Sequence, residues 1–250
     1  MRFACVHTDG GTVFARLDGD RAHELARGPW EGAHPLGVTH AWTERDLRCP
    51  VRPSKIICIG RNYAAHAREL GNEPPKEPLL FLKPPSALIG PGDAIVLPRE
   101  SEKVEHEAEL GVVIGTRGRD VAPADALAHV FGYTCVGDIT ARDLQKKDGQ
   151  WTRAKGFDTF CPVGPWIETE LDPKKSRVTC RVDGKVRQDA PTSDMIFDVP
   201  TLIAYASRVM TLEPGDLLVT GTPEGVGPLV SGGTLEIEVA GIGVLTVRVA

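Results

Sequence analysis

Three carboxylates on alternate positions, followed at once by an apolar run, most constrain how this chain can fold. They are Glu105, Glu107 and Glu109 in "VEHEAELGVVIG", residues 104–115. Side chains two residues apart in a strand point to the same face, and the apolar run indicates that this strand enters a core. Buried like charges repel one another unless a cation compensates them. The Cα atoms of Glu107 and Glu109 would lie roughly 7 Å apart, so both carboxylates can reach one ion.

A charged strand edge in solvent explains the same pattern, and the pair alone does not decide between the two interpretations. Glu105 stands nearest the start of the strand, so we expect it in solvent. A third oxygen ligand would favour a metal site, and Asp138 ends another apolar strand, "YTCVGDIT". Taken alone, Asp138 is more typical of a turn or a helix cap.

A second pair of residues suits proton transfer. The segment "NYAAHAREL" predicts a short helix, with Asn62 as its N-cap and Gly71 just after its end. His66 and Glu69 are three residues apart and can face each other. A carboxylate beside an imidazole raises its basicity, which suits a general base. An ordinary exposed salt bridge is the commoner explanation of an isolated pair.

The chain divides into a small β-rich segment, residues 1–50, and a main domain, residues 51–250, joined at the proline-rich "RCPVRPSK". The dipeptide Asp183-Gly184 predicts a hairpin. The segments "VPTLIAYASRVMTL" and "APADALAHVFG" have helical spacing. Strands outnumber helices and do not alternate with them regularly, so we expect a mixed, mainly β fold.

Composition narrows the class of protein. The 250 residues carry a net charge of −5, which gives no electrostatic reason to bind nucleic acid or an anionic membrane. The start has no secretory signal, and no apolar run has the length to span a bilayer. The six cysteines are scattered, as is typical of reduced thiols. We therefore expect a cytoplasmic protein without nucleic-acid or membrane partners.

Seven segments occur in the order seen in the fumarylacetoacetate hydrolase superfamily, which the chain resembles from about residue 55 to residue 227. They are "CIGRNYAAHARELG", "FLKPPSALIG", "HEAELGVVIG", "GDITARDLQ", "KGFDTFCPVGPWI", "TSDMIF" and "TGTPEGVG". The segments "GPWI" and "TSDMIF" resemble the 2-hydroxyhepta-2,4-diene-1,7-dioate isomerase branch most. "GRNYAAHARE" and "HEAELGVV" resemble the acylpyruvase and oxaloacetate decarboxylase branch equally.

The resemblance implies a β-roll of distorted sheets around the active site, with a few short helices, in a homodimer. It also implies a divalent ion, Mg²⁺ with Mn²⁺ or Ca²⁺ as alternatives, and small-molecule 2-oxo acid substrates. The matching metal ligands are Glu107, Glu109 and Asp138, and the matching catalytic residues are His66, Glu69 and Lys155. The matching substrate-binding residues are Arg61, Tyr63, Lys83, Arg142, Gln145 and Thr222. Gly137 departs from the family pattern, because many members have Asn before the metal-binding Asp.

These features predict a divalent-metal-dependent enzyme that acts on a 2-oxo, acylpyruvate-type dicarboxylate through a metal-stabilised enolate. Our first interpretation is an isomerase/decarboxylase of aromatic-acid catabolism, similar to 2-hydroxyhepta-2,4-diene-1,7-dioate isomerase. The alternatives are an acylpyruvate or fumarylacetoacetate-type C–C hydrolase and an oxaloacetate decarboxylase. A non-catalytic, metal-stabilised β-fold that binds small ligands is the alternative from a different class. One enolate serves all three reactions, so the reaction stays open at this point.

Overall fold

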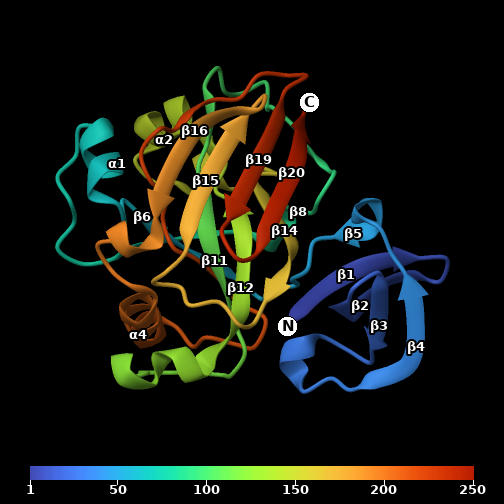
Figure 1. Ribbon diagram of the computed structural model, residues 1–250. Coiled ribbons are helices and arrows are strands. Elements are labelled where there is room, and N and C mark those ends of the chain that lie inside the picture. The colour runs from blue at the N-terminus through green and yellow to red at the C-terminus, as the bar shows by residue number, and fades with distance from the viewer.

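The computed structural model describes residues 1–250 and confirms a mixed, mainly β fold with short helices (Figure 1). Its largest sheet has twelve strands, and all pairs are antiparallel except β17–β6 and β14–β8. The order is β4 (Pro35–Ala41), β3 (Arg21–Leu25), β2 (Gly11–Asp18), β1 (Arg2–Thr8), β14 (Cys161–Glu168), β12 (Val130–Gly137), β11 (Ala108–Ile114), β17 (Leu217–Val219), β6 (Ile56–Gly60) and β7 (Leu79–Lys83). In addition, β5 (Leu47–Arg48) pairs with β1, and β8 (Leu88–Ile89) pairs with β14.

Two smaller sheets complete the β structure. The five-stranded sheet has the order β16 (Lys185–Pro191), β15 (Arg177–Val182), β19 (Thr234–Val239), β20 (Gly243–Val249) and β9 (Ala94–Ile95). The three-stranded sheet has the order β13 (Thr140–Ala141), β10 (Val104–His106) and β18 (Gly227–Pro228). The predicted hairpin is confirmed, because Asp183 and Gly184 turn β15 into β16 with φ angles of 52° and 72°.

The main core lies between the two larger sheets. Figure 1 shows four strands of the five-stranded sheet, β15, β16, β19 and β20, in orange to red, packed against the green β11 and β12. Leu110, Val112 and Ile114 of β11 point into this core, whereas Val113 points into a second cluster on the opposite face of the large sheet. Both faces of β11 are therefore buried, which explains the apolar run from Leu110 to Ile114.

Four α-helices are present: α1 (Ala64–Glu69), α2 (Arg142–Asp148), α3 (Thr152–Lys155) and α4 (Val199–Val209). The predicted amphipathic helix is confirmed in α4, where Asp198 caps the N-terminus by accepting a hydrogen bond from the Thr201 amide at 3.1 Å. The helical spacing at "APADALAHVFG" becomes a 3-10 helix over Pro123–His129. None of the helices has the length and apolar character needed to cross a membrane.

The N-terminal strands β1–β5 lie on the flank of the molecule opposite α1 (Figure 1). They enclose a small core of their own, made of Ala4, Val6, Ala15, Leu17, Ala22 and Leu47. Strand β1 also pairs with β14, which joins this segment to the large sheet. The boundary near residue 50 stays a prediction.

Candidate active site

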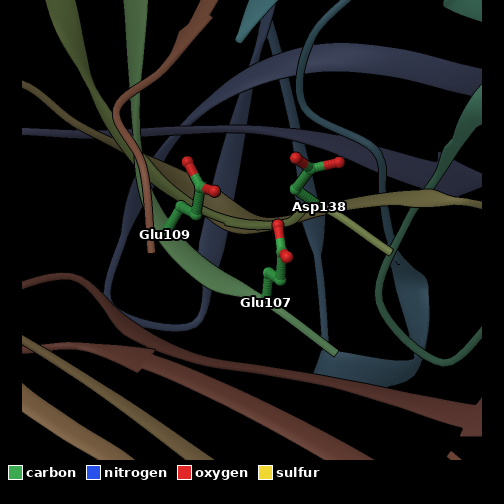
Figure 2. Close-up of side chains that lie close together, drawn as sticks. All are labelled: Glu107, Glu109 and Asp138. Carbon is green, nitrogen blue, oxygen red and sulfur yellow. The ribbon is translucent and has the colours of Figure 1, made fainter. Parts of the chain in front are cut away.

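The carboxylates meet where three strands end. Strand β10 stops at His106 and β11 starts at Ala108, so Glu107 occupies the break between the two strands. Its carbonyl accepts a hydrogen bond from the Asp138 amide at 2.8 Å, which brings the end of β12 beside it. Figure 2 shows the side chains of Glu107, Glu109 and Asp138 converging, and one oxygen of each lies within 4.8 Å of the others. All three residues are buried.

The electrostatics of the three carboxylates differ. Burial raises the pKa of Glu109 well above its ordinary value, and the neighbouring Asp138 and Glu107 raise it further. The Gly221 amide donates a hydrogen bond to Glu109 and opposes this effect. Burial acts on Glu107 in the same sense, but the Lys155 and Arg142 cations outweigh it and hold the pKa of Glu107 below its ordinary value.

Two lysines surround Asp138. Lys155, at the end of α3, donates hydrogen bonds to Glu107 Oε2 at 2.8 Å and to Asp138 Oδ2 at 2.5 Å. Lys83, at the end of β7, donates to Asp138 Oδ1 at 2.7 Å and to the Ile139 carbonyl at 3.1 Å. Burial lowers the pKa of Lys155, but Asp138 and Glu107 together raise it above its ordinary value, so this ammonium is charged at neutral pH.

The expectation that Glu105 lies in solvent is wrong, because only 5% of this residue is exposed. Arg142, the first residue of α2, donates from Nε to Glu105 at 2.7 Å and from Nη2 to Glu107. Its Nη1 donates to Gln145 Oε1 at 2.7 Å. Lys103 Nζ lies 3.0 Å from the other Glu105 oxygen. Arg142 and Lys103 therefore compensate the buried charge of Glu105. Arg142 belongs to α2, 37 residues away in the sequence.

The donor set suits a hard divalent cation. It consists of three buried carboxylates that supply only oxygen atoms, as Mg²⁺, Mn²⁺ and Ca²⁺ prefer. Repulsion by Asp138 and Glu107 contributes to the raised pKa of Glu109, and a divalent cation bound between the three carboxylates would relieve it. The residues present thus fit the ion that the resemblance implies.

The predicted dyad is only partly formed. His66 is 4% exposed, and its Nδ1 lies 3.5 Å from Glu69 Oε2 without forming a hydrogen bond. Glu69 instead accepts from the Gly225 amide, at 3.0 Å and 3.2 Å to its two oxygens. Burial lowers the pKa of His66, so its imidazole is neutral at pH 7. Asn62 does not cap α1 as predicted: its side-chain amide donates to the Phe197 and Thr220 carbonyls, and Tyr63 is the N-cap residue.

Sequence reasoning missed Gln188, which connects the two sides of the site. Its Oε1 accepts from the Ala108 amide at 3.0 Å and lies 3.2 Å from His106 Nδ1. Its Nε2 donates to Thr222 Oγ1 and to the Pro223 carbonyl, both at 2.7 Å. The Thr222 hydroxyl in turn donates to the Ala108 carbonyl at 2.9 Å. No sequence signal distinguishes this glutamine from an exposed residue of a hairpin strand.

One cavity of about 530 Å³ brings most of the predicted residues together. Those on its walls are Arg61, His66, Glu69, Glu107, Glu109, Asp138, Arg142, Gln145, Lys155 and Thr222. Lys83 and Tyr63 do not line it; Lys83 reaches Asp138 from behind, and the buried Tyr63 hydroxyl has no hydrogen-bond partner. The wall also contains Phe81 and Trp151, which the sequence did not indicate.

Comparison with known proteins identifies relatives of this chain. The family model "Fumarylacetoacetate (FAA) hydrolase C-terminal" matches residues 55–250. The crystal structure of 2-hydroxyhepta-2,4-diene-1,7-dioate isomerase from Mycobacterium marinum superposes on this chain with a TM-score of 0.92. The two sequences are 43% identical, and the match covers 100% of this chain and 98% of that chain. Fumarylpyruvate hydrolase from Pseudomonas aeruginosa, crystallised with Mn²⁺ and pyruvate, is 37% identical, with a TM-score of 0.75 over 81% of this chain and 91% of that chain.

A third relative has another named activity. The mitochondrial oxaloacetate decarboxylase of Dictyostelium discoideum is 48% identical over 195 residues, which is 75% of this chain and 89% of that protein. The three relatives bear the names of an isomerase, a hydrolase and a decarboxylase, so their named activities differ. The match over residues 55–250 and these identities show that the chain belongs to the fumarylacetoacetate hydrolase family.

Proposed function

We propose that this protein is a divalent-metal-dependent enzyme that acts on a 2-oxo, acylpyruvate-type dicarboxylate. The observation that carries the proposal is the convergence of Glu107, Glu109 and Asp138 beside a charged lysine in one cavity. Mg²⁺ is our first choice of ion, and the Mn²⁺ held by the fumarylpyruvate hydrolase supports a divalent ion in general. A bound ion would supply Lewis-acid stabilisation of negative charge that develops on a keto oxygen.

The residues of the chain have separate parts in this proposal. Lys155 and Arg142 contribute positive charge, which offsets the repulsion between the carboxylates and an anionic substrate. Lys155 is protonated and acts as a cation or proton donor, not as a base. Neutral His66 is the group that accepts a proton.

The first choice among reactions is that of a 2-hydroxyhepta-2,4-diene-1,7-dioate isomerase/decarboxylase of aromatic-acid catabolism. The support is the named isomerase of Mycobacterium marinum, which matches the whole chain, N-terminal segment included. This reaction moves a proton and needs no attacking water. Neutral His66 and charged Lys155 supply the acceptor and the donor that it requires.

A C–C hydrolase is the second candidate, and a specific observation favours it. His66 is buried, neutral and adjacent to Glu69, as a base that activates water requires. Oxaloacetate decarboxylation, the activity named for the Dictyostelium relative, needs only stabilisation of the enolate and is the third candidate. A metal-stabilised β-fold that binds small ligands without catalysis is the candidate from a different class. Such a protein would have no need of a neutral buried imidazole.

Product identification tests the proposal. The purified protein is treated with EDTA, reloaded with Mg²⁺, Mn²⁺ or Ca²⁺, and given three substrates: the heptadiene dioate, an acylpyruvate and oxaloacetate. We expect turnover of at least one substrate with metal and none without it. Turnover that is unaffected by EDTA would contradict the metal proposal. Binding of Mn²⁺ and oxalate without any turnover would favour the non-catalytic class.

The homodimer is a further part of the proposal and is tested separately. Size-exclusion chromatography with light scattering should give twice the 26.9 kDa mass of the chain. A mass of a single chain at micromolar concentration would contradict it.

A further inference from the structure

Arg61 is a cation on the cavity wall that has no acidic partner. Arg142 and Lys155 bind buried carboxylates, and Lys103 lies 3.0 Å from Glu105. Arg61 forms neither an ion pair nor a hydrogen bond with any residue of the chain, although it is half-buried. Its guanidinium is therefore free to form charge-assisted hydrogen bonds with an anionic ligand that enters the cavity.

The backbone at Arg61 is unfavourable for an arginine. Its φ angle is +58°, in the left-handed region where glycine and asparagine are far more common. Non-glycine residues with such backbone angles cluster at active sites and ligand-binding sites, where the position of the side chain compensates the backbone strain. The turn follows directly after β6 and turns the chain toward α1, so Arg61 lies at the entrance of the helix that carries His66.

An aromatic wall lies between Arg61 and Lys155. Lys155 Nζ lies 5.0 Å from the centre of the Phe81 ring, and the Phe81 and Trp151 rings are 5.2 Å apart at 73°. Arg61 Cζ lies 6.0 Å from the centre of the Trp151 ring. Trp151 packs against the backbone just before Arg61, because a Cβ on Gly60 would lie 3.0 Å from its Cζ3 atom. Two aromatic rings thus separate an inner cation from an outer one.

We propose that Arg61 binds the second carboxylate of a dicarboxylic substrate, whose spacer lies against Phe81 and Trp151. This inference rests on the proposed function, in which the 2-oxo acid end lies beside Lys155. The planar fork of a guanidinium matches a carboxylate, and aromatic faces suit a planar unsaturated spacer. The substrate class is therefore a 2-oxo acid whose distal carboxylate is separated from the keto group by several carbons.

Lys146 is the other cation of the cavity without an acidic partner, and it is the natural comparison. It is exposed, and neither of the wall rings lies under its ammonium. An exposed, hydrated lysine contributes little to binding a carboxylate. The geometry therefore assigns the distal carboxylate to Arg61.

The experiment measures binding to the Mn²⁺-loaded protein by calorimetry with three probes. Oxalate represents the inner end of the substrate. The six-carbon acids 2-oxoadipate and 2-oxohexanoate differ only in the distal carboxylate. The variants are Arg61→Met, Arg61→Lys, Arg61→Gly and, as the matched control, Lys146→Met. Arg61→Gly relieves the left-handed backbone, so it keeps the test valid if Arg61→Met folds poorly.

We expect the wild type to bind 2-oxoadipate about 10- to 100-fold more tightly than 2-oxohexanoate, the range for a charge-assisted hydrogen bond. Arg61→Met and Arg61→Gly should lose this preference and leave the affinities for oxalate and 2-oxohexanoate unchanged. Arg61→Lys should retain a part of it, and Lys146→Met all of it. Trp151→Leu should weaken both six-carbon acids and spare oxalate.

Two results would overturn the inference, and they are distinguishable. If oxalate and both 2-oxo acids bind but the preference survives in Arg61→Met and Arg61→Gly, Arg61 does not bind the distal carboxylate and the proposed function stands. If the Mn²⁺-loaded wild type binds none of the three probes, the proposed function fails and this inference fails with it.

Discussion

The ammonium of Lys155 lies 2.5 Å from Asp138 Oδ2 and also donates to Glu107. It therefore contacts two of the three carboxylates proposed as metal ligands. A divalent ion and this lysine compensate the same negative charges. The stability of the metal-free protein and its affinity for metal should consequently respond to Lys155 in opposite directions.

Replacing Lys155 by Met tests this relationship. We expect the free energy of unfolding of the metal-free protein to fall by about 3–5 kcal/mol, because two buried carboxylates lose a partner. Mn²⁺ should then stabilise the variant more than the wild type, and turnover of every substrate should fall. Urea unfolding with and without Mn²⁺ measures both effects.

The control for this experiment is Lys174→Met. The exposed Lys174 pairs with Asp198 at 2.9 Å, and an exposed pair contributes about 0–1 kcal/mol. A smaller stabilisation by Mn²⁺ in Lys155→Met than in the wild type would contradict the shared site.

The metal ligands are tested by Glu107→Ala and Asp138→Ala. We expect each variant to lose divalent-ion binding and activity, because removing one of three oxygen donors leaves an incomplete site. Isothermal titration with Mg²⁺ and Mn²⁺ measures the affinity, and circular dichroism verifies the fold. Glu102→Gln, which alters an exposed carboxylate five residues before Glu107, is the control. Unchanged metal affinity in both alanine variants would refute the site.

His66 separates the candidate reactions. Hydrolysis needs an activated water, so His66→Ala should lower acylpyruvate hydrolysis by roughly 10²–10⁴-fold, the usual span for loss of a general base. Oxaloacetate decarboxylation needs no attacking water and should fall much less. Steady-state rates on both substrates provide the measurement. A wild-type rate of hydrolysis in His66→Ala would show that its pairing with Glu69 is only structural.

The same imidazole predicts a dependence on pH. Burial lowers the pKa of His66 below 6.5, so the base stays neutral through pH 7, and hydrolysis should decline only below pH 6.5. The unfolded chain takes up this proton at higher pH than the folded protein. The contribution of neutral His66 to the free energy of unfolding is therefore fully present well above pH 6.5. It is lost progressively as the pH falls below 6.5.

Urea unfolding at pH 5.5 and 7.5, in wild type and His66→Gln, measures this effect on stability. His106 is also buried, which lowers its pKa, and it contributes in the same direction in both proteins. The contribution of His66 is therefore the difference between wild type and His66→Gln in the stability lost from pH 7.5 to pH 5.5. An identical loss of stability in both proteins at pH 5.5 would exclude a contribution from His66.

Helix α1 should change its dynamics when ligand binds. It has only six residues, and short helices are marginal without packing. Its Glu69 accepts a hydrogen bond from the Gly225 amide, and we expect ligand binding to order the helix beside the cavity. Hydrogen exchange with Mn²⁺, in the presence and absence of oxalate, should show added protection of residues 62–75. Helix α4 serves as the internal control, and equal protection of residues 62–75 in both states would contradict a lid.

Features set by neighbouring residues could be predicted from the sequence. The Asp183-Gly184 turn and the amphipathic α4 depend on local conformation and periodicity, and both are confirmed. The alternation of Glu107 and Glu109 is a local feature too, and the structure brings both carboxylates together. Family resemblance added Asp138, which the residues alone would have assigned to a turn.

Features that join distant parts of the chain were decided by the tertiary structure. Glu105 was expected in solvent because it stands nearest the start of the strand, yet Arg142, 37 residues away, donates a hydrogen bond to it in the interior. Gln188 reaches Ala108 across 80 residues, and the Glu69 contact with Gly225 spans 156. The order of the strands brings these partners together, and that order depends on the burial of apolar surface over the whole chain. Local periodicity and turns can therefore predict the elements and some of the ligands, but not the cations and amides that compensate them.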